Sequence, residues 1–399
     1  MAFSQIRIVI GIATPDMEYK IPLFDLNYDE TEERAVIETL RSKWISTGPK
    51  TTEFEATFAK ALGARHAIAL ANCTVALHLA FHTLNIQPGD EVICPSLTFI
   101  ATVNALRYVG ATPVFCDVTS TSDLTMDPVH LQSLVSNKTR AIVVMHYGGF
   151  PCNMAPIMDV AGRKNIAVIE DASHGPLSEY HGKKLGTIGL IGCFSFFSNK
   201  NISTGEGGML VTDDDAIAAR VRSLRSHGMT TLSYERSKGH TTEYDVLELG
   251  FNYRMDDIRA ALGLVQLAKL QPDLKARASL RHRYLSGLSE IDDIVVPFNY
   301  HEEFVSNYIF PIVLRDSNVH RRDTIRQALK ERGIQTSVHY PPVHRFHIYR
   351  QYQATLPTTE YVGENEITLP LFSRMTVDQV DLVVQALKDA LAWARRSSS

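Results

Sequence analysis

Two residues could together act on a carbonyl compound: Asp171 and Lys200, each close behind an apolar run that is typical of a strand. A lysine amine must be neutral to attack a carbonyl, and desolvation by Phe194, Phe196 and Phe197 would favour the neutral amine. A carboxylate that meets a pyridine nitrogen keeps that nitrogen protonated and makes the ring an electron sink. The pair therefore indicates covalent catalysis on a pyridine-type cofactor.

A phosphate-binding turn and a stacking ring accompany this pair. Asn72-Cys73-Thr74 lies between a predicted strand and the start of the next predicted helix, where backbone N–H groups and the helix dipole would hold a phosphate. Phe99, just past another strand, could stack on a flat ring. Alone, each residue has a structural explanation, because a lysine after a strand is commonly solvated and Phe99 would normally be core. Their joint order along the chain favours pyridoxal phosphate (PLP) as the cofactor.

The elements that must position these residues alternate between strands and helices. Strands are expected at 66–70, 91–95, 112–118, 140–146, 165–171, 192–197 and 207–212, and helices at 74–85, 99–110 and 156–165. Helical crossovers between such strands predict an α/β fold with a mainly parallel sheet covered on both faces. Open parallel sheets bind ligands at the carboxyl ends of their strands, which is where the candidate residues lie.

A second, smaller α+β domain is expected toward the C-terminus. A long helix over about 255–285 is suited to bridging two domains. After it the pattern predicts strands at 308–314 and 334–340 and helices at 321–333 and 377–396. We expect an N-terminal arm over 1–29, a large cofactor-binding domain over 30–265 and a small C-terminal domain over 266–399.

Composition excludes several classes of protein. The 399 residues carry 40 Lys+Arg against 44 Asp+Glu, a net charge of −4, which argues against nucleic acid as a partner. The five cysteines are odd in number and form no CxxC, as is usual for reduced thiols in the cytoplasm. No apolar run reaches the length of a membrane span, and Arg7 interrupts the apolar start, which disfavours a signal peptide. We expect a soluble, cytoplasmic protein.

Seven segments resemble the DegT/DnrJ/StrS family of sugar aminotransferases, which are PLP enzymes of the aspartate aminotransferase fold (fold type I). They are WISTGPKTTEFEATFA (44–59), EVICPSLTFIATVNAL (91–106), VIEDASHG (168–175), FSFFSNKNISTGEGGMLVT (194–212), GFNYRMDDIRAALGLVQL (250–267), SVHYPPVH (337–344) and ITLPLF (367–372). The resemblance covers about residues 20–390, and the stretch around Lys200 is the most specific part of it.

The resemblance implies three catalytic residues. Lys200 would form a Schiff base with PLP and move the proton between substrate and cofactor. Asp171 would pair with the pyridinium nitrogen. His174, at a position where glutamine is common, would hydrogen-bond the phenolic oxygen of the ring.

The resemblance also implies five cofactor-binding residues besides these. Thr74, the backbone at Cys73 and the hydroxyl of Ser195 would bind the phosphate, and Phe99 would stack on the ring. Asn252 would reach the phosphate of the neighbouring subunit's cofactor. This would make the protein a homodimer with shared sites.

Two departures from the family pattern concern the site. The phosphate turn is usually Ser-Gly-Thr, so Cys73 would be strained if its position needs a positive φ. Arg259 replaces a frequent glutamine and could affect the sugar site.

The resemblance implies transfer of an amino group from glutamate or glutamine to a nucleotide-linked keto-deoxysugar. The tract STGEGG (203–208) is more similar to members that aminate C-4 than to those that aminate C-3. A cyclitol (inosose) aminotransferase and a non-catalytic PLP-binding regulatory protein remain alternatives. Lys200 disfavours the related sugar dehydratases, which carry histidine at this position.

The histidines of SVHYPPVHRFH could also suggest a metal site. His339, His344 and His347 lie close in sequence, but no carboxylate or cysteine completes a ligand set. Pro341 and Pro342 prevent a helix that would place them on one face. We therefore expect no metal.

Overall fold

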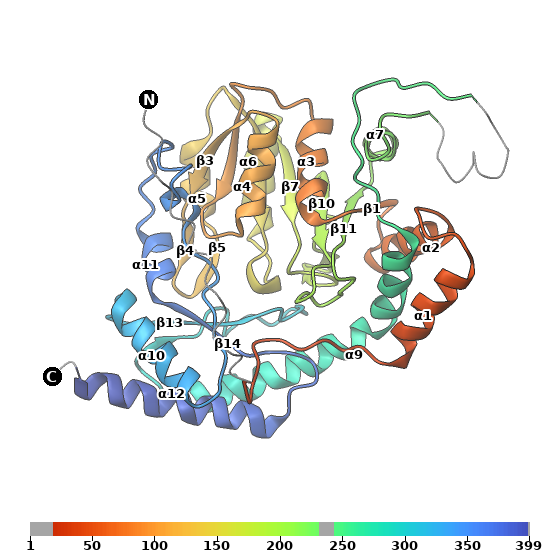
Figure 1. Ribbon diagram of the computed structural model, residues 1–399. Helices are drawn as coiled ribbons and strands as arrows, with labels where there is room; N and C mark the ends of the chain where they lie inside the picture. Colours follow the sequence, from red (N-terminus) through yellow and green to blue (C-terminus); the bar gives the residue numbers. More distant parts are fainter. Residues whose placement is uncertain (1–18, 231–242, 398–399) are drawn as a thin grey trace, which may run out of the picture.

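The large domain is built on one seven-stranded sheet. The computed structural model describes residues 19–230 and 243–397, and its main sheet has the strand order β1-β11-β10-β7-β6-β2-β3 (Figure 1). These strands are β1 (His66–Leu70), β2 (Glu91–Pro95), β3 (Thr112–Cys116), β6 (Thr139–Met145), β7 (Ala167–Asp171), β10 (Ile191–Ser195) and β11 (Gly208–Thr212). Neighbouring strands are parallel except that β11 runs antiparallel to both β1 and β10.

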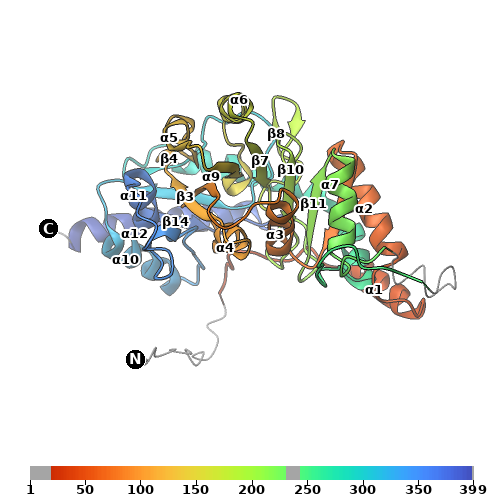
Figure 2. The same ribbon diagram turned by 90° about the horizontal axis from the view of Figure 1, so that it is seen from above.

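Helices cover both faces of this sheet, as crossover connections require. Seen from above, α3 and α4 lie on one face and α5 and α6 on the other, with α2 and α7 at the β1 end (Figure 2). The helices are α1 (Glu30–Arg41), α2 (Pro49–Leu62), α3 (Cys73–Thr83), α4 (Ile100–Tyr108), α5 (Pro128–Leu134), α6 (Met154–Lys164) and α7 (Asp215–Leu224). Short pieces complete this part: β4 (Val118–Ser120), β5 (Asp123–Met126), a 3₁₀ turn (Tyr147–Gly149), β8 (Glu179–Tyr180) and β9 (Lys183–Lys184).

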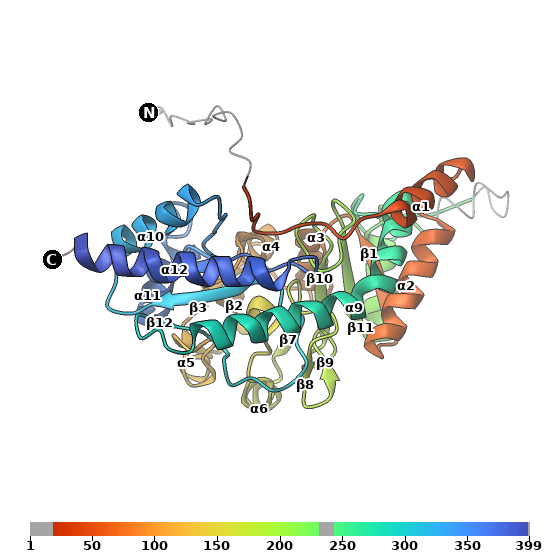
Figure 3. The same cartoon turned by 90° about the horizontal axis from the view of Figure 1, so that it is seen from below.

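The second sheet belongs to the C-terminal part. Its strands, in the order β12-β13-β14, are antiparallel. The elements here are α9 (Asp257–Leu288), β12 (Ile294–Val295), β13 (Phe310–Leu314), α10 (Val319–Glu331), a 3₁₀ turn (Val343–Arg345), α11 (Pro357–Asn365), β14 (Glu366–Leu369) and α12 (Val377–Ser397). From below, α9 runs from beside α1 and α2 to the second sheet, where it lies alongside α12 (Figure 3).

Buried hydrophobic clusters support both sheets. Side chains of β1, β10 and β11 are buried against α2 and α3 on the two faces of the main sheet. The second sheet packs on α9, α10 and α12 through another cluster centred on Tyr284, Phe310 and Leu387. The two sheets are held together by α9, which contributes to cores in both parts, and by a further cluster that contains Met145 of β6 and Val313 of β13.

The parallel sheet and the long helix confirm the α/β prediction. Each expected strand between 66 and 212 is present, with ends that differ by a few residues. The strand expected at 334–340 is wrong. That segment makes only single bridges, Ile21 with Ile334 and Ser337 with Thr368, because its residues face two different partners. Residues 1–18 of the expected arm lie outside the described residues.

Candidate active site

The carboxyl ends of four parallel strands meet around one cavity of about 410 Å³. Asp171 ends β7, Ser195 ends β10, and short segments lead from β1 and β2 to Asn72 and Phe99. The cavity is lined by Asn72, Cys73, Thr74, Leu77, Phe99, Ala101, Asp171, Ser173, Ser195, Phe197, Asn199, Lys200, Glu206, Tyr308, His339 and Tyr340. The volume falls within the range of small-molecule and cofactor sites. The structure thus brings together six of the eight predicted site residues.

The phosphate turn is the N-terminus of α3. Asn72 caps this helix in extended conformation (φ −168°), and its side-chain oxygen accepts a hydrogen bond from Val75 N at 3.0 Å. Cys73 begins the helix and is not among the described residues with positive φ, so the strain considered for the departure from Ser-Gly-Thr is absent. The first N–H groups of a helix have no acceptor within it and point toward an anion placed there.

The remaining groups of this turn suit a phosphate as well. Thr74 and Ser195 line the same cavity and supply two hydroxyl groups. Burial raises the pKa of the Cys73 thiol well above its usual value, so the thiol stays neutral and adds no negative charge beside the phosphate. The helix dipole then acts on the anion without opposition from this side chain.

Gly208 allows β11 to approach this turn. It is the first residue of β11 and pairs with Leu70 on one side and Ser195 on the other. A Cβ at Gly208 would lie 2.4 Å from the carbonyl carbon of Asn72 and 2.6 Å from Cys73 N, far inside normal contact. The close approach brings the start of α3 next to β11 and Ser195, the two walls of the predicted phosphate site, which explains the glycine at this position.

Asp171 is held in a fixed orientation at the base of the cavity. It is 4% exposed, and its Oδ2 accepts a hydrogen bond of 2.7 Å from Thr102 Oγ1. Ser173 N donates to Oδ1 at 3.2 Å. A carboxylate with this support and an open side toward the cavity suits pairing with a protonated ring nitrogen.

Lys200 lines the same cavity, where its amine lies against the ring of Tyr308 from the second domain. Its Nζ is 4.1 Å from the ring centroid of Tyr308, and Lys200 N closes a turn with Phe197 O at 2.8 Å. The predicted wall of three phenylalanines is wrong in part. Phe194 and Phe196 are buried in the core with Phe54 and Phe58, and only Phe197 lines the cavity.

Phe194 and Phe196 are absent from the cavity wall because successive side chains of a strand point to opposite faces of the sheet. Phe194 and Phe196 point to the core face of β10 and its extension, whereas Ser195 and Phe197 point to the cavity face. A period-2 reading of the stretch CFSFF would have separated the two sets.

His174 reaches the cavity only through another residue. It is 1% exposed, Gly148 N donates to its Nδ1 at 3.3 Å, and Nε2 lies 3.0 Å from Tyr340 Oη. Since Nδ1 accepts, Nε2 carries the hydrogen and donates it to Tyr340. Burial and the nearby Lys200 charge hold the pKa of His174 well below its usual value, so the ring is neutral. Its hydrogen bond to the phenolic oxygen of a cofactor stays a prediction.

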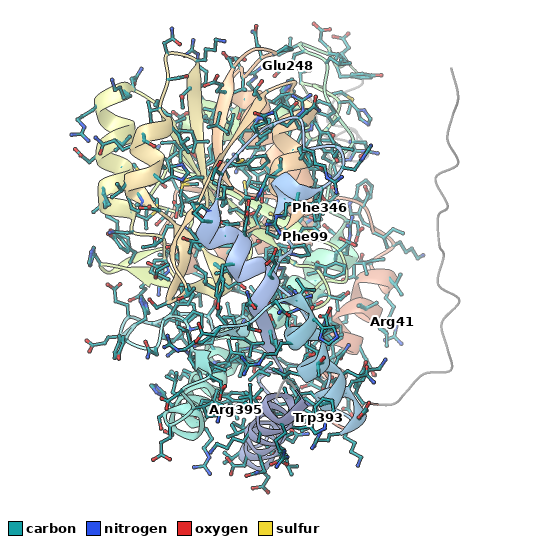
Figure 4. The ribbon with its side chains drawn as sticks, turned by 90° about the vertical axis from the view of Figure 1, so that its left-hand side faces the viewer. Arg41, Phe99, Glu248, Phe346, Trp393 and Arg395 are labelled. Carbon is teal, nitrogen blue, oxygen red and sulfur yellow. The ribbon has the colours of Figure 1, made fainter. Side chains whose placement is uncertain are left out.

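Phe99 and Asn252 are both exposed, and of the two only Phe99 lines the cavity. Phe99 is 55% exposed at the start of α4, with its ring centroid 6.0 Å from that of Tyr340. Figure 4 places it at mid-height, between the main sheet and the helix end that carries Trp393. Asn252 is exposed and does not line the cavity of its own chain.

Arg259 links the backbone just after β1 to the backbone just before β11. Its Nη1 donates to Ala71 O at 3.2 Å and to Glu206 O at 3.4 Å, and its Nε donates to Asp256 at 2.7 Å. It does not line the cavity in this chain.

Residues of the second domain also line the cavity, and the sequence predicted no individual role for them in the site. Tyr308, His339 and Tyr340 line the cavity although they follow Asp171 by more than a hundred residues. His339 and Tyr340 belong to SVHYPPVH (337–344), a stretch that the family resemblance places at the substrate entrance, whereas Tyr308 lies outside it. Among residues 19–230 and 243–397, no group of three or more His, Cys, Asp or Glu side chains is arranged to hold a metal ion.

The residues present fit PLP. The helix N-terminus and two hydroxyls suit a phosphate, Asp171 suits a ring nitrogen, and Lys200 suits an aldehyde carbon. Asn199 lines the cavity, and its buried Oδ1 has no hydrogen-bond partner among the described residues. Buried polar atoms are normally hydrogen-bonded, so this atom is suited to accept a hydrogen bond from a bound ligand. None of the described helices is long and apolar enough to cross a membrane.

Comparison with known proteins gives one consistent result. A sequence model of the DegT/DnrJ/EryC1/StrS aminotransferase family matches residues 27–388. The spore coat polysaccharide biosynthesis protein SpsC of Bacillus subtilis (strain 168) is 38% identical over 386 residues, which cover 95% of this chain and 98% of SpsC.

Solved structures agree with the sequence comparison. Spr1654 of Streptococcus pneumoniae, described as a sugar aminotransferase, superposes in its PMP form with a TM-score of 0.89 at 29% identity, covering 95% of this chain and all of that one. It is also known in a PLP form. Helicobacter pylori PseC, an aminotransferase involved in the biosynthesis of pseudoaminic acid, gives a TM-score of 0.87 at 28% identity over 94% of this chain and 99% of its own.

Proposed function

We propose, from the premise that the chain belongs to the DegT/DnrJ/EryC1/StrS aminotransferase family, that it moves an amino group from glutamate or glutamine to a nucleotide-linked keto-deoxysugar. The protein is a PLP-dependent sugar aminotransferase. The observation that carries the proposal is the placement of Lys200, Asp171 and the α3 N-terminus around one cavity. We favour a C-4 keto group over a C-3 keto group as the acceptor, because the sequence of the STGEGG tract (203–208) is more similar to members that aminate C-4.

Within this site each residue has a task that follows from its position. PLP, when bound, supplies a conjugated ring that stores the electron pair left when a substrate C–H bond breaks. Lys200 Nζ is the group that takes up that proton and returns it to the neighbouring carbon. Asp171 keeps a proton on the ring nitrogen, and the hydrogen bonds from Thr102 and Ser173 N keep the carboxylate aimed.

Other residues bind and orient. The first N–H groups of α3, Thr74 and Ser195 hold the phosphate and so fix the register of the ring above Asp171. Phe99 covers one edge of the cavity and is exposed enough to meet an incoming substrate. Tyr308 and Tyr340 add aromatic surface to the same cavity, with the Tyr308 ring centroid 4.1 Å from Lys200 Nζ and the Tyr340 ring centroid 6.0 Å from that of Phe99.

Two relatives support a sugar as the acceptor. PseC takes part in the biosynthesis of pseudoaminic acid, and SpsC in the biosynthesis of a spore coat polysaccharide. Both chains align with this one over nearly their full length.

We also propose a homodimer with shared sites. Leu247 is 73% exposed and Leu249 is 86% exposed, just before Asn252, and an apolar cluster of this kind commonly marks a protein interface. If this segment contacts a second copy of the chain, Asn252 can reach the partner's phosphate site. We place the protein in the cytoplasm, which its five buried cysteines without disulfides support.

The test is a half-reaction with purified protein. We expect glutamate or glutamine to bleach the visible absorbance of lysine-bound PLP, and a nucleotide-linked 4-ketosugar to restore it after the donor is removed. A matched Lys200→Ala variant should show neither change. Recovery with inosose alone would indicate the cyclitol enzyme, and no recovery with 4-keto, 3-keto or inosose substrates would contradict the proposal.

A further inference from the structure

A buried carboxyl group of β14 is linked to the active site by hydrogen bonds. Glu366 and Thr368 are two residues apart, so both point to the same face of this strand. Thr368 Oγ1 lies 2.5 Å from Glu366 Oε1 and 2.8 Å from His339 Nδ1. Glu366 Oε2 accepts a hydrogen bond of 2.7 Å from His339 N. We call this chain of contacts the Glu366–Thr368–His339 relay.

The relay is shielded from water at one end and opens on the cavity at the other. Glu366 and Thr368 are fully buried, and His339 is 8% exposed. His339 lines the cavity that holds Lys200. Nδ1, N and O of His339 are all engaged, the last by Tyr147 Oη, whereas Nε2 has no protein partner among the described residues. Nε2 is therefore the atom of this ring that can meet a substrate.

The protonation state of Glu366 determines the tautomer of His339, because the Thr368 hydroxyl between them has a single hydrogen. When Glu366 is ionised, Thr368 donates to Oε1 and accepts from His339 Nδ1–H, which leaves Nε2 without a hydrogen. When Glu366 is protonated, it donates to Thr368, and Thr368 donates to Nδ1. The hydrogen of the neutral imidazole then sits on Nε2.

We propose that Glu366, acting through Thr368, selects the tautomer of His339, so that Nε2 donates a hydrogen bond to an oxygen atom of the substrate while Glu366 is protonated and loses this ability when Glu366 ionises. His339 is then the residue that contacts substrate, and Glu366 and Thr368 are positioning residues. The inference rests on the proposed function, since a keto or carboxylate oxygen of the substrates is the acceptor.

The surroundings place the transition in an accessible pH range. Burial raises the pKa of Glu366 to about 8, against the opposing effects of Thr368, the His339 N–H and the positive charges of Arg322 and Arg326. Burial, and then the Lys200 charge, lowers the pKa of His339 to about 3, so its ring is neutral throughout. The other titratable groups facing the relay are Tyr147 and Tyr340 near Glu366 and His174 near His339. Near neutral pH the donor form is therefore expected.

Glu366→Gln is a direct probe, because an amide can fill this site in only one orientation. Its oxygen must accept from His339 N, so its NH₂ group must donate to Thr368. Thr368 then donates to Nδ1 at every pH, and His339 stays in the Nε2–H form. Thr368→Val removes the hydroxyl at nearly constant shape, and Thr368→Ser, the matched control, keeps it.

The first measurement needs no substrate. Proton–nitrogen correlation spectra of the holoenzyme with ¹⁵N-labelled histidine report which ring nitrogen carries hydrogen, and His339→Gln identifies the signal among the fifteen histidines. In the unmodified protein the hydrogen should move from Nε2 to Nδ1 with a midpoint near pH 8. Glu366→Gln should show no movement, and Thr368→Ser should behave like the unmodified protein. If Glu366→Gln does not fold, Thr368→Val should lose the transition that Thr368→Ser keeps.

The second measurement is the ratio of kcat/KM for Glu366→Gln to that of the unmodified enzyme at each pH, in which other titrating groups cancel. The ratio should be constant below about pH 8 and rise roughly tenfold per pH unit above it. A constant ratio, a fixed tautomer in the unmodified protein, or a transition that persists in Glu366→Gln would overturn the inference. An unmodified enzyme without sugar aminotransferase activity would instead contradict the proposed function and leave the spectra unaffected.

Discussion

Asp171 and His174 lie three residues apart and are held in quite different ways. The Asp171 carboxylate opens on the cavity, with Thr102 and Ser173 N behind it. His174 has protein partners on both ring nitrogens and touches the cavity through Tyr340. A substitution at Asp171 would therefore remove the predicted contact with the ring nitrogen, whereas one at His174 would also remove the hydrogen bond that it makes with Tyr340.

We expect Asp171→Asn to lower kcat/KM far more than His174→Ala. Loss of the ring proton should cost several kcal/mol of barrier, and each 1.4 kcal/mol corresponds to about tenfold in rate. Thr102→Val should fall between Asp171→Asn and the unmodified enzyme, since it leaves the carboxylate in place but less well aimed. Steady-state kinetics at one pH decide the order, with Thr102→Ser as the control that keeps the hydroxyl. A larger loss for His174→Ala would show that the roles are assigned wrongly.

At the scale of elements, the antiparallel strand β11 is the feature that shapes the phosphate site. Gly208 lies against the backbone of Asn72 and Cys73, where no Cβ can fit. Gly208→Ala must therefore push the start of α3 away from β11 and separate the groups that are predicted to bind the phosphate.

We expect Gly208→Ala to weaken PLP binding by at least about tenfold, measured by cofactor titration of the unloaded protein. The control is Gly162→Ala in α6, where a Cβ meets nothing within 4 Å and alanine should stabilise the helix slightly. Equal PLP affinity in the two variants would show that the close approach of β11 is not needed.

Local sequence patterns predict the elements of the main sheet but not every side-chain orientation or strand pairing. The strands and helices of the main sheet were predictable because apolar runs and crossover helices are local patterns. Asp171, Lys200 and the turn at Cys73 were predictable because each follows a strand at the same edge. The orientation of Phe194 and Phe196 needed the strand's period. The strand at 334–340 failed because its residues make only single bridges with two different partners, Ile21 and Thr368.

Contacts between the two domains could not be predicted at all. Tyr308 over Lys200, and Tyr340 beside His174, depend on how the second sheet docks on the first. No local periodicity encodes that docking. The Glu366–Thr368–His339 relay is hidden for the same reason, since its members come from two segments that meet only in the folded chain.

At the scale of the whole molecule, the exposed segment with Leu247, Leu249 and Asn252 predicts that two chains build each site. Cofactor binding and dimerisation would then be linked, so dilution should release PLP and PLP should stabilise the dimer. Leu249→Arg should weaken the dimer and lower PLP affinity together, as measured by analytical ultracentrifugation and cofactor titration.

Complementation gives the sharper result. In a mixture of Lys200→Ala and Asn252→Ala chains, one site of each heterodimer carries both lesions and the other carries neither, so part of the activity should return. An active monomer, or heterodimers without recovered activity although Asn252→Ala alone is impaired, would contradict shared sites.

The position of β11 between β1 and β10 also has a consequence for biosynthesis. β1 is an edge strand of the main sheet, and its partner in that sheet is β11. His66 therefore cannot pair before Thr212 has been synthesised and has left the ribosome. Pairing across such a sequence distance is slow compared with local helix formation. A nascent chain that ends before Gly208 would already contain Lys200 and Asp171, yet its phosphate site would lack a wall. We therefore expect PLP to bind late, after β11 has left the ribosome and completed the sheet.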